Sequence, residues 1–80
     1  MDLNGFDFTY YPNPTRDVLN INSQKSVRTV EVFNLAGQKV MNSTNLANDQ
    51  VDVSKLSAGV YVFKVTLDGG QVETFKIVKK

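Results

Sequence analysis

The sequence contains neither cysteine nor histidine. Disulfides, the usual structural zinc sites, thiol nucleophiles and imidazole bases are therefore excluded, and we expect no metal or cofactor. Basic and acidic residues nearly balance, with a net charge of +1, so neither nucleic acid nor an anionic membrane is indicated as a partner. Unbroken apolar runs are only a few residues long, which is too short for a helix that spans a membrane. What remains is a small domain that has no thiol or imidazole for catalysis.

Short runs of β-branched and aromatic residues occur along the 80 residues. We find no window with apolar residues at the i, i+3, i+4 and i+7 spacing of an amphipathic helix. Most of these runs instead alternate apolar and polar residues, as half-buried strands do, and residues typical of turns separate them. The runs are Phe6–Tyr10, Val18–Ile21, Arg28–Phe33, Lys39–Met41, Gln50–Val53, Val60–Leu67 and Val72–Val78. Seven short strands at this spacing predict an all-β sandwich.

The segments between the runs predict particular turns. In the sequence from Asn34 to Gly37, a type I turn is expected, with the asparagine side chain capping it and the glycine at positive φ. Asp68–Gly70 predicts a second tight hairpin, between the last two strands. Asn13–Arg16 fits a type I turn with proline at its favoured second position.

Ser54–Gly59 is too short for a helix of its own. We expect a single helical turn that crosses one end of the sandwich. Leu56 would enter the core as a plug, and Gly59 would redirect the backbone before the next strand.

No arrangement of side chains indicates catalysis. The eight carboxylates fall mostly in turns or on the polar faces of strands, which is typical of solvated surface acids. Ser54 and Ser57 have no histidine to activate them. Gly69 and Gly70 precede a strand rather than a helix, unlike a phosphate-binding loop. We therefore predict that the chain is not an enzyme.

Two surface features each permit a functional and a purely structural interpretation. Tyr10 and Tyr11 are consecutive, so on a strand one of them must face outward, where an aromatic ring can stack on a sugar. Lys76, Lys79 and Lys80 at the end of the chain either keep an edge strand solvated or form a handle for an acidic or edge-pairing partner.

The order of the motifs along the chain is more specific than any single motif. The ordered motifs are Tyr11–Pro14, Val18–Ile21, Val30–Val40, Val53–Val65 and Lys76–Lys80. In this order the sequence closely resembles the type A C-terminal sorting domain of cargo proteins exported by the type IX, or Por, secretion system of Bacteroidetes-type bacteria. The resemblance implies a seven-stranded immunoglobulin-like antiparallel β-sandwich at the end of a larger secreted protein.

The resemblance also implies which residues matter. By position, the family motifs fall on Pro12, Asn13 and Pro14, on Asn34, Gly37 and Val40, on Leu56, Gly59 and Tyr61, and on Lys76 to Lys80. Our hypothesis is that the export machinery binds the exposed face or edge of the last hairpin. Its candidate contacts are Lys64, Lys76, Lys79 and Lys80, and the residues expected to maintain its shape are Gly59 and Tyr61.

The partners implied by the resemblance are the outer-membrane secretion machinery and an upstream cargo domain in cis. A sortase-like cysteine peptidase is expected to remove the domain, and can join the cargo to lipopolysaccharide at the cell surface. The protein would then be secreted or held at the cell surface after passing through the periplasm and the outer membrane. The sorting domain would span residues 6–80, with residues 1–5 as a linker remnant or an added start. These first residues lack the basic and apolar stretches of a signal peptide.

Two alternatives remain open at this point. One is an immunoglobulin-like accessory module that binds a glycan or a protein outside the cell, for which Tyr10 and Tyr11 are the visible candidates. The other is a structural spacer. Exposed edge strands also lead us to expect weak self-association.

Overall fold

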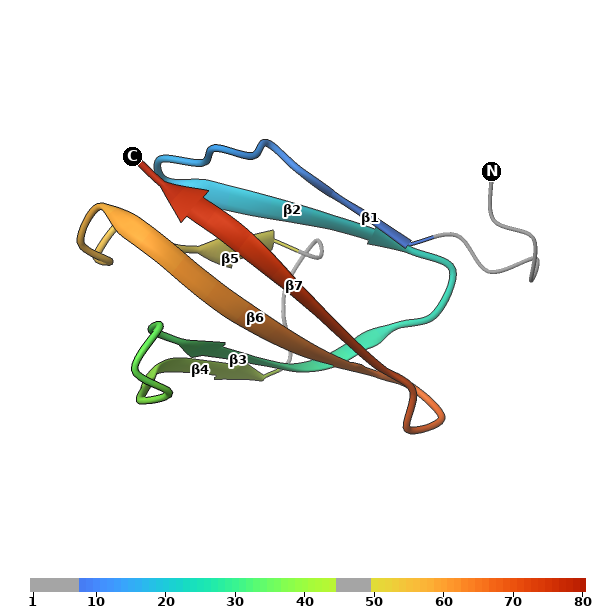
Figure 1. The fold of residues 1–80 in the computed structure, drawn as a ribbon. Helices are drawn as coiled ribbons and strands as arrows, with labels where there is room; N and C mark the ends of the chain where they lie inside the picture. The colour runs from blue at the N-terminus through green and yellow to red at the C-terminus, as the bar shows by residue number, and fades with distance from the viewer. Residues whose placement is uncertain (1–7, 45–49) are drawn as a thin grey trace.

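Two β-sheets packed face to face make up the computed structural model, which describes residues 8–44 and 50–80 (Figure 1). The seven strands are β1 (Phe8–Tyr11), β2 (Val18–Ser23), β3 (Val27–Phe33), β4 (Lys39–Thr44), β5 (Gln50–Asp52), β6 (Gly59–Leu67) and β7 (Val72–Lys79). The predicted seven-stranded sandwich is confirmed. The proposed linker at residues 1–5 and the predicted strand start at Phe6 lie outside the described residues.

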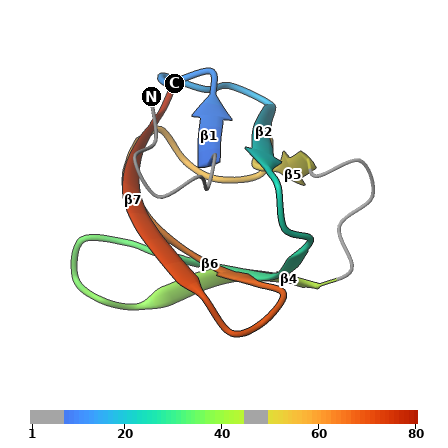
Figure 2. The same cartoon turned by 90° about the vertical axis from the view of Figure 1, so that its right-hand side faces the viewer.

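The strand order shows how the chain moves between the two layers. One sheet has the order β1-β2-β5 and the other has the order β4-β3-β6-β7, and every neighbouring pair is antiparallel. The chain crosses from the smaller to the larger sheet between β2 and β3 and again between β5 and β6, and it returns to the smaller sheet between β4 and β5. Figure 2 shows the two layers from the end of the sandwich. This is an immunoglobulin-like arrangement. In the described part of the chain, no helix is long and apolar enough to cross a membrane.

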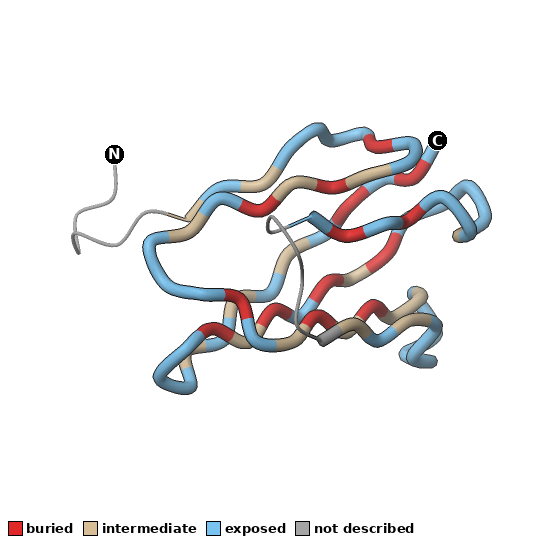
Figure 3. The backbone as a smooth tube through the Cα atoms, turned by 180° about the vertical axis from the view of Figure 1, so that it is seen from behind, coloured by how far each residue is buried: buried red, intermediate tan, exposed pale blue. Residues whose placement is uncertain are grey.

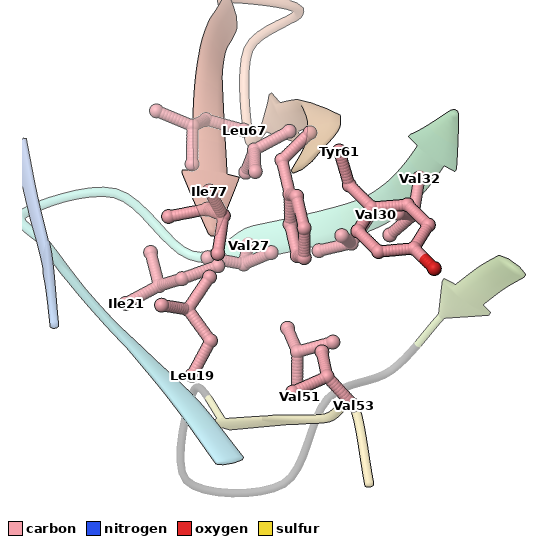
Figure 4. Close-up of a cluster of buried hydrophobic side chains, with 12 residues drawn as sticks. Leu19, Ile21, Val27, Val30, Val32, Val51, Val53, Tyr61, Leu67 and Ile77 are labelled. Carbon is pink, nitrogen blue, oxygen red and sulfur yellow. The ribbon is translucent and has the colours of Figure 1, made fainter. Parts of the chain in front are cut away.

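Alternation of side chains along the strands produces the core between the layers (Figure 3). Leu19 and Ile21 of β2 lie across the core from Ile77 of the larger sheet (Figure 4). Phe63 belongs to the same buried cluster. The buried hydrophobic residues are Leu19, Ile21, Val27, Val30, Val32, Val51, Val53, Tyr61, Phe63, Val65, Leu67 and Ile77. Both sheets contribute to this set, so burial of the apolar faces holds the two layers together.

The turn after β3 has the predicted asparagine cap and the predicted glycine at positive φ. The Gly37 N–H donates to the Asn34 carbonyl at 3.0 Å, and Gly37 has a φ of 87°. The Asn34 side-chain oxygen accepts hydrogen bonds from the backbone N–H groups of Ala36 and Gln38, both at 3.0 Å. Asn34 therefore caps the turn, as expected.

The turn between β6 and β7 is also tight, as expected. The Gly70 N–H donates to the Leu67 carbonyl at 3.0 Å, and the Leu67 N–H donates to the Gln71 carbonyl at 2.7 Å. Gly69 and Gly70 both have a φ of 91°.

Three local predictions differ from the structure. Asn13 and Pro14 form bends instead of the predicted type I turn. The reason is that the Asn13 side chain and the Thr15 backbone form hydrogen bonds with β7 and with Lys80 instead of closing a local turn. Instead of the predicted helical turn, the segment that begins at Ser54 forms a β-turn, in which the Leu56 N–H donates to the Val53 carbonyl at 3.0 Å. β4 continues to Thr44, beyond the predicted end at Met41, because β3 offers it hydrogen-bonding partners as far as Thr29.

Candidate functional site

The hairpin of β6 and β7 presents a regular outer face. The two strands pair without a register shift, from Gly59 opposite Lys79 to Thr66 opposite Val72. Side chains that alternate away from the core form this outer face: Val60, Val62, Lys64, Thr66, Val72, Thr74, Lys76 and Val78. Lys64 and Lys76 are exposed on it, where two of the predicted contact residues were expected.

The outer face of the larger sheet carries more positive than negative charge. Glu31 of β3 lies opposite Lys64, and its carboxylate forms an ion pair with the Lys39 ammonium, with 2.9 Å between Nζ and Oε2. The hydrogen bond from Lys39 lowers the pKa of Glu31, and the positive charges of Lys39 and Lys64 lower it further. Glu31 is therefore ionised at neutral pH and is partnered by Lys39, which leaves Lys64 and Lys76 as the exposed cations of the hairpin.

A segment far away in sequence holds the end of β7. We call Pro12–Thr15 the proline segment. The Val78 N–H donates to the Asn13 side-chain oxygen at 3.0 Å, and the Thr15 N–H donates to the Val78 carbonyl at 2.8 Å. The Lys80 N–H then donates to the Thr15 carbonyl at 2.8 Å, in a parallel bridge between Thr15 and Lys79. The proline segment thus acts as a short neighbouring strand for the last residues of β7. In Figure 2 it is the blue segment after β1 at the top of the view, near the C-terminus.

Thr15 was not predicted as a site residue, yet it is 1% exposed. Its hydroxyl donates to the Val18 carbonyl at 2.8 Å, which links the proline segment to β2. A threonine after Asn-Pro is an unremarkable turn residue in sequence, so only the spatial contact with β7 identifies its role.

Lys79 does not lie where we predicted. It alternates toward the interior of the sandwich and is 9% exposed, so the prediction that it contacts a partner from the surface is wrong. Its ammonium donates to the Lys80 carbonyl at 3.0 Å. The inward position follows from the alternation that places Ile77 in the core. Lys80, beyond the end of β7, is exposed.

The residues expected to maintain the hairpin's shape lie at its entry. Tyr61 is buried, and its hydroxyl donates to the Ser57 carbonyl at 2.7 Å. Leu56 packs against the core while partly buried, so it covers the core edge rather than filling its centre. Gly59 begins β6 with a φ of 155° opposite Lys79. Because Gly59 lies opposite Lys79 and Lys79 pairs with Thr15, the entry of the hairpin lies at the end of the sandwich that also holds the proline segment.

The consecutive tyrosines separate as the strand geometry requires. Tyr10 stacks on Phe75 with ring centroids 3.9 Å apart, while Tyr11 is 54% exposed on the outer face of the smaller sheet. The Asn20 side-chain amide donates to the Tyr11 carbonyl at 3.2 Å. The structure thus brings one aromatic ring, not two, to the surface at this position.

Other chemistry is sparse. No group of three or more acidic side chains that could hold a metal ion occurs among the described residues, 8–44 and 50–80. A pocket is lined by Val40, Met41, Asp52, Lys55 and Leu56. Hydrogen bonds from the Ser54 hydroxyl and backbone N–H lower the pKa of Asp52, so this carboxylate is ionised at neutral pH.

Comparison with known proteins places this geometry in context. The family profile described as the secretion system C-terminal sorting domain matches residues 9–80. A curated protein, Beta-agarase D from Zobellia galactanivorans, is 40% identical over 68 residues, which cover 85% of the chain and 14% of that protein. The chain therefore corresponds to a small part of this relative.

Proposed function

Because the chain belongs to the family of secretion system C-terminal sorting domains, we propose that the type IX export machinery of the outer membrane recognises it through the outer face of the β6–β7 hairpin. The domain is a non-catalytic sorting signal for type IX secretion, and a protein that carries it is secreted or displayed at the cell surface. The match over residues 9–80 is the observation that carries this function. It favours sorting over the accessory-module and spacer alternatives.

The finer route is part of the proposal. An upstream cargo domain in cis crosses the periplasm and is taken through the outer membrane with this domain attached. A sortase-like peptidase then removes the domain and can attach the cargo to the surface. A relative in which the matching stretch makes up 14% of the protein is consistent with a large upstream cargo.

The contacts we propose are Lys64, Lys76 and Lys80, which are exposed. Lys64 and Lys76 lie on adjacent strands, and Lys76 pairs with Val62, the outward residue before Lys64. Two cations at this spacing beside an apolar strip suit a partner surface that carries carboxylates. In this scheme Gly59 and Tyr61 act indirectly, by maintaining the hairpin.

A reporter assay tests the proposal. The 80-residue chain is fused to the C-terminal end of a periplasmic reporter in a host that has the export system, and the exported fraction is measured. We expect export of the wild-type fusion and a severalfold loss with Lys64→Glu and with Lys76→Glu, tested separately so that each variant reverses one charge. The matched control is Lys55→Glu, which reverses an exposed cation outside the hairpin.

Two results would contradict the proposal. Retention of the wild-type fusion in the periplasm would overturn the sorting function in this host. Equal loss of export in the Lys55→Glu control would show that net charge, rather than the hairpin face, controls export.

A further inference from the structure

The four edge strands of the sandwich differ in how well they are protected. β1 has four residues and is followed by Pro12, and β5 has three residues. β4 pairs with β3 through a register shift at Val32 and Phe33. Short length, proline and bulges are the devices by which proteins prevent unwanted strand pairing. β7 is different, because it has eight residues in regular register with β6.

Alternation of the backbone groups shows which residues of β7 face the open edge. Gln71 bonds to β6 through its carbonyl, whereas Val78 bonds to the proline segment on the opposite side. In a regular antiparallel strand these directions alternate. Val72, Thr74 and Lys76 therefore direct their backbone groups away from β6.

The proline segment occupies only the far end of this edge. Asn13 and Thr15 bond to Val78 and Lys80, and the Asn13 amide reaches the Lys76 carbonyl at 3.5 Å. Within the described residues, the outward N–H and C=O groups of Val72 and Thr74 have no hydrogen-bond partner. Among the described residues, the edge thus lies open from Val72 to the N–H of Lys76, between the β6–β7 turn and the proline segment, whose Asn13 reaches the Lys76 carbonyl.

We propose that this open edge, Val72 to Lys76, is a docking site for an extended segment of a partner protein, which pairs with β7 as an additional strand and places a carboxylate opposite Lys76. The inference rests on the proposed function and deepens it, since it names the chemistry by which the export machinery contacts the hairpin. The backbone groups of an edge strand provide affinity in this mode, and alternate side chains provide specificity.

Charge decides between a partner protein and a second copy of this chain. Side chains of an added strand that lie on the outer face would stand beside Lys76 and near Lys64, with no acidic residue on the outer face of β6 or β7 to offset them. Two β7 edges paired in antiparallel register around Thr74 would instead place Lys76 of each copy opposite Val72 of the other, with no carboxylate opposite either lysine. A pair of opposite charges on facing strands stabilises pairing, whereas a valine opposite a lysine does not, so an acidic partner strand fits better than self-association.

The inward side chains of the open edge are Phe75 and Glu73, and the Glu73 carboxylate accepts a hydrogen bond from the Gln71 side-chain amide at 2.8 Å. Phe75 packs against Phe8, Tyr10 and Phe63, with ring centroids 3.9 to 5.8 Å away. A partner segment that alternates acidic and apolar residues therefore suits β7, because its acidic residues would lie outward beside Lys76 and would not face the inward Glu73, while an apolar residue would lie toward the Phe75 ring.

Hydrogen exchange of individual amides tests the proposal on the isolated 80-residue chain. The probe is a seven-residue peptide of alternating glutamate and valine, and its control has lysine in place of glutamate. At ten times its Kd, the glutamate peptide should slow exchange of the Thr74 amide about tenfold. The amides of Glu73 and Phe75, which face β6, serve as internal references.

Substitutions at one position separate edge pairing from loss of folding. Thr74→Pro removes an outward N–H without removing a bond to β6, and Thr74→Val keeps that N–H. We expect Thr74→Pro to bind the glutamate peptide at least about fivefold more weakly than Thr74→Val. Lys76→Glu leaves the backbone unchanged and should reverse the preference between the two peptides. This second variant decides the question if Thr74→Pro does not fold.

Three results would overturn the inference. They are equal binding of both peptides, no protection of the Thr74 amide by either peptide, and protection that depends only on protein concentration, which would assign the edge to a second copy.

The reporter fusion separates this inference from the proposed function. Loss of export in Thr74→Pro but not in Thr74→Val would support edge pairing. Export of the wild type and of folded Thr74→Pro at equal levels would overturn edge pairing alone, whereas failure of the wild-type fusion would overturn the sorting function itself.

Discussion

Asn13 takes the place that the backbone of a neighbouring strand would occupy beside β7. Its side-chain oxygen accepts the Val78 N–H at 3.0 Å, and Thr15 continues the pairing to Lys80. An asparagine side chain can do this because its amide carries the same donor and acceptor as a peptide group. The two prolines beside Asn13 restrict the backbone of this segment.

Asn13→Ala should expose the end of β7 without disturbing its pairing with β6. We expect a loss of about 1 kcal/mol in the free energy of unfolding, from one hydrogen bond. Hydrogen exchange should accelerate at the Val78 amide and stay unchanged at Ile77, which faces β6. The control is Asn22→Ala, an exposed asparagine on β2, with an expected change within about 0.5 kcal/mol. Equal effects of the two substitutions in urea denaturation would contradict a special role for Asn13.

Glu31 makes the stability of the fold depend on pH in the acidic range. Its pKa is lowered from 4.5 in the folded state by Lys39 first and by Lys64 as well. A lowered folded-state pKa stabilises the fold above the unfolded-state value, and this contribution disappears as the pH falls through the folded-state value. The free energy of unfolding should therefore fall on acidification below about pH 4.5. Glu31→Gln should reduce this slope, and an unchanged slope would contradict the assignment.

The hairpin turn after β3 is an element whose conformation depends on one backbone position. Gly37 has a φ of 87°, and a side chain built there would meet no atom within 4 Å. Any cost of Gly37→Ala must therefore come from the backbone rather than from crowding. We expect a loss of about 1–2 kcal/mol in thermal or urea denaturation. Gly37→Asn should lose less, because asparagine tolerates positive φ better. An alanine variant as stable as the wild type would refute this account.

At the scale of elements, local patterns predict most of the fold. Alternation along Val60–Leu67 identifies the inward and outward faces of β6, and the Asn34–Gly37 turn follows from local chemistry. The bends at Asn13 and Pro14 could not be predicted in this way. Their hydrogen-bond partners lie more than 60 residues away on β7, and a turn propensity contains no information about such a partner.

For the candidate site, the sequence predicts the exposure of a side chain only where it follows from the alternation of residues along a single strand. Lys64 and Lys76 lie on the exposed face because their neighbours are core residues. Lys79 obeys the same alternation and is buried, although a terminal lysine in a basic tail suggests exposure. Here the compositional argument failed and the periodicity argument would have succeeded. The open edge of β7 depends on sheet order, which hairpin signals alone do not determine.

At the scale of the whole molecule, the two outer faces differ in charge. The larger sheet presents Lys39, Lys64 and Lys76 with one carboxylate, Glu31. The outward residues described on the smaller sheet are Thr9, Tyr11, Val18, Asn20, Asn22, Gln50 and Asp52, which include no cation. A protein of net charge +1 thus has one preferred side for an acidic partner, and that side exists only when both sheets are assembled.

Sorting should therefore require the folded sandwich. A core of this size supplies only roughly 3–5 kcal/mol, and Phe63→Ala would remove about as much, since Phe63 is 1% exposed and packs against Phe75. We expect Phe63→Ala to lose near-ultraviolet circular dichroism and reporter export together. Val18→Ala, on the outward face of β2, should cost about 1 kcal/mol and leave export intact. Normal export of an unfolded Phe63→Ala chain would show that a linear segment, not the assembled face, is the signal.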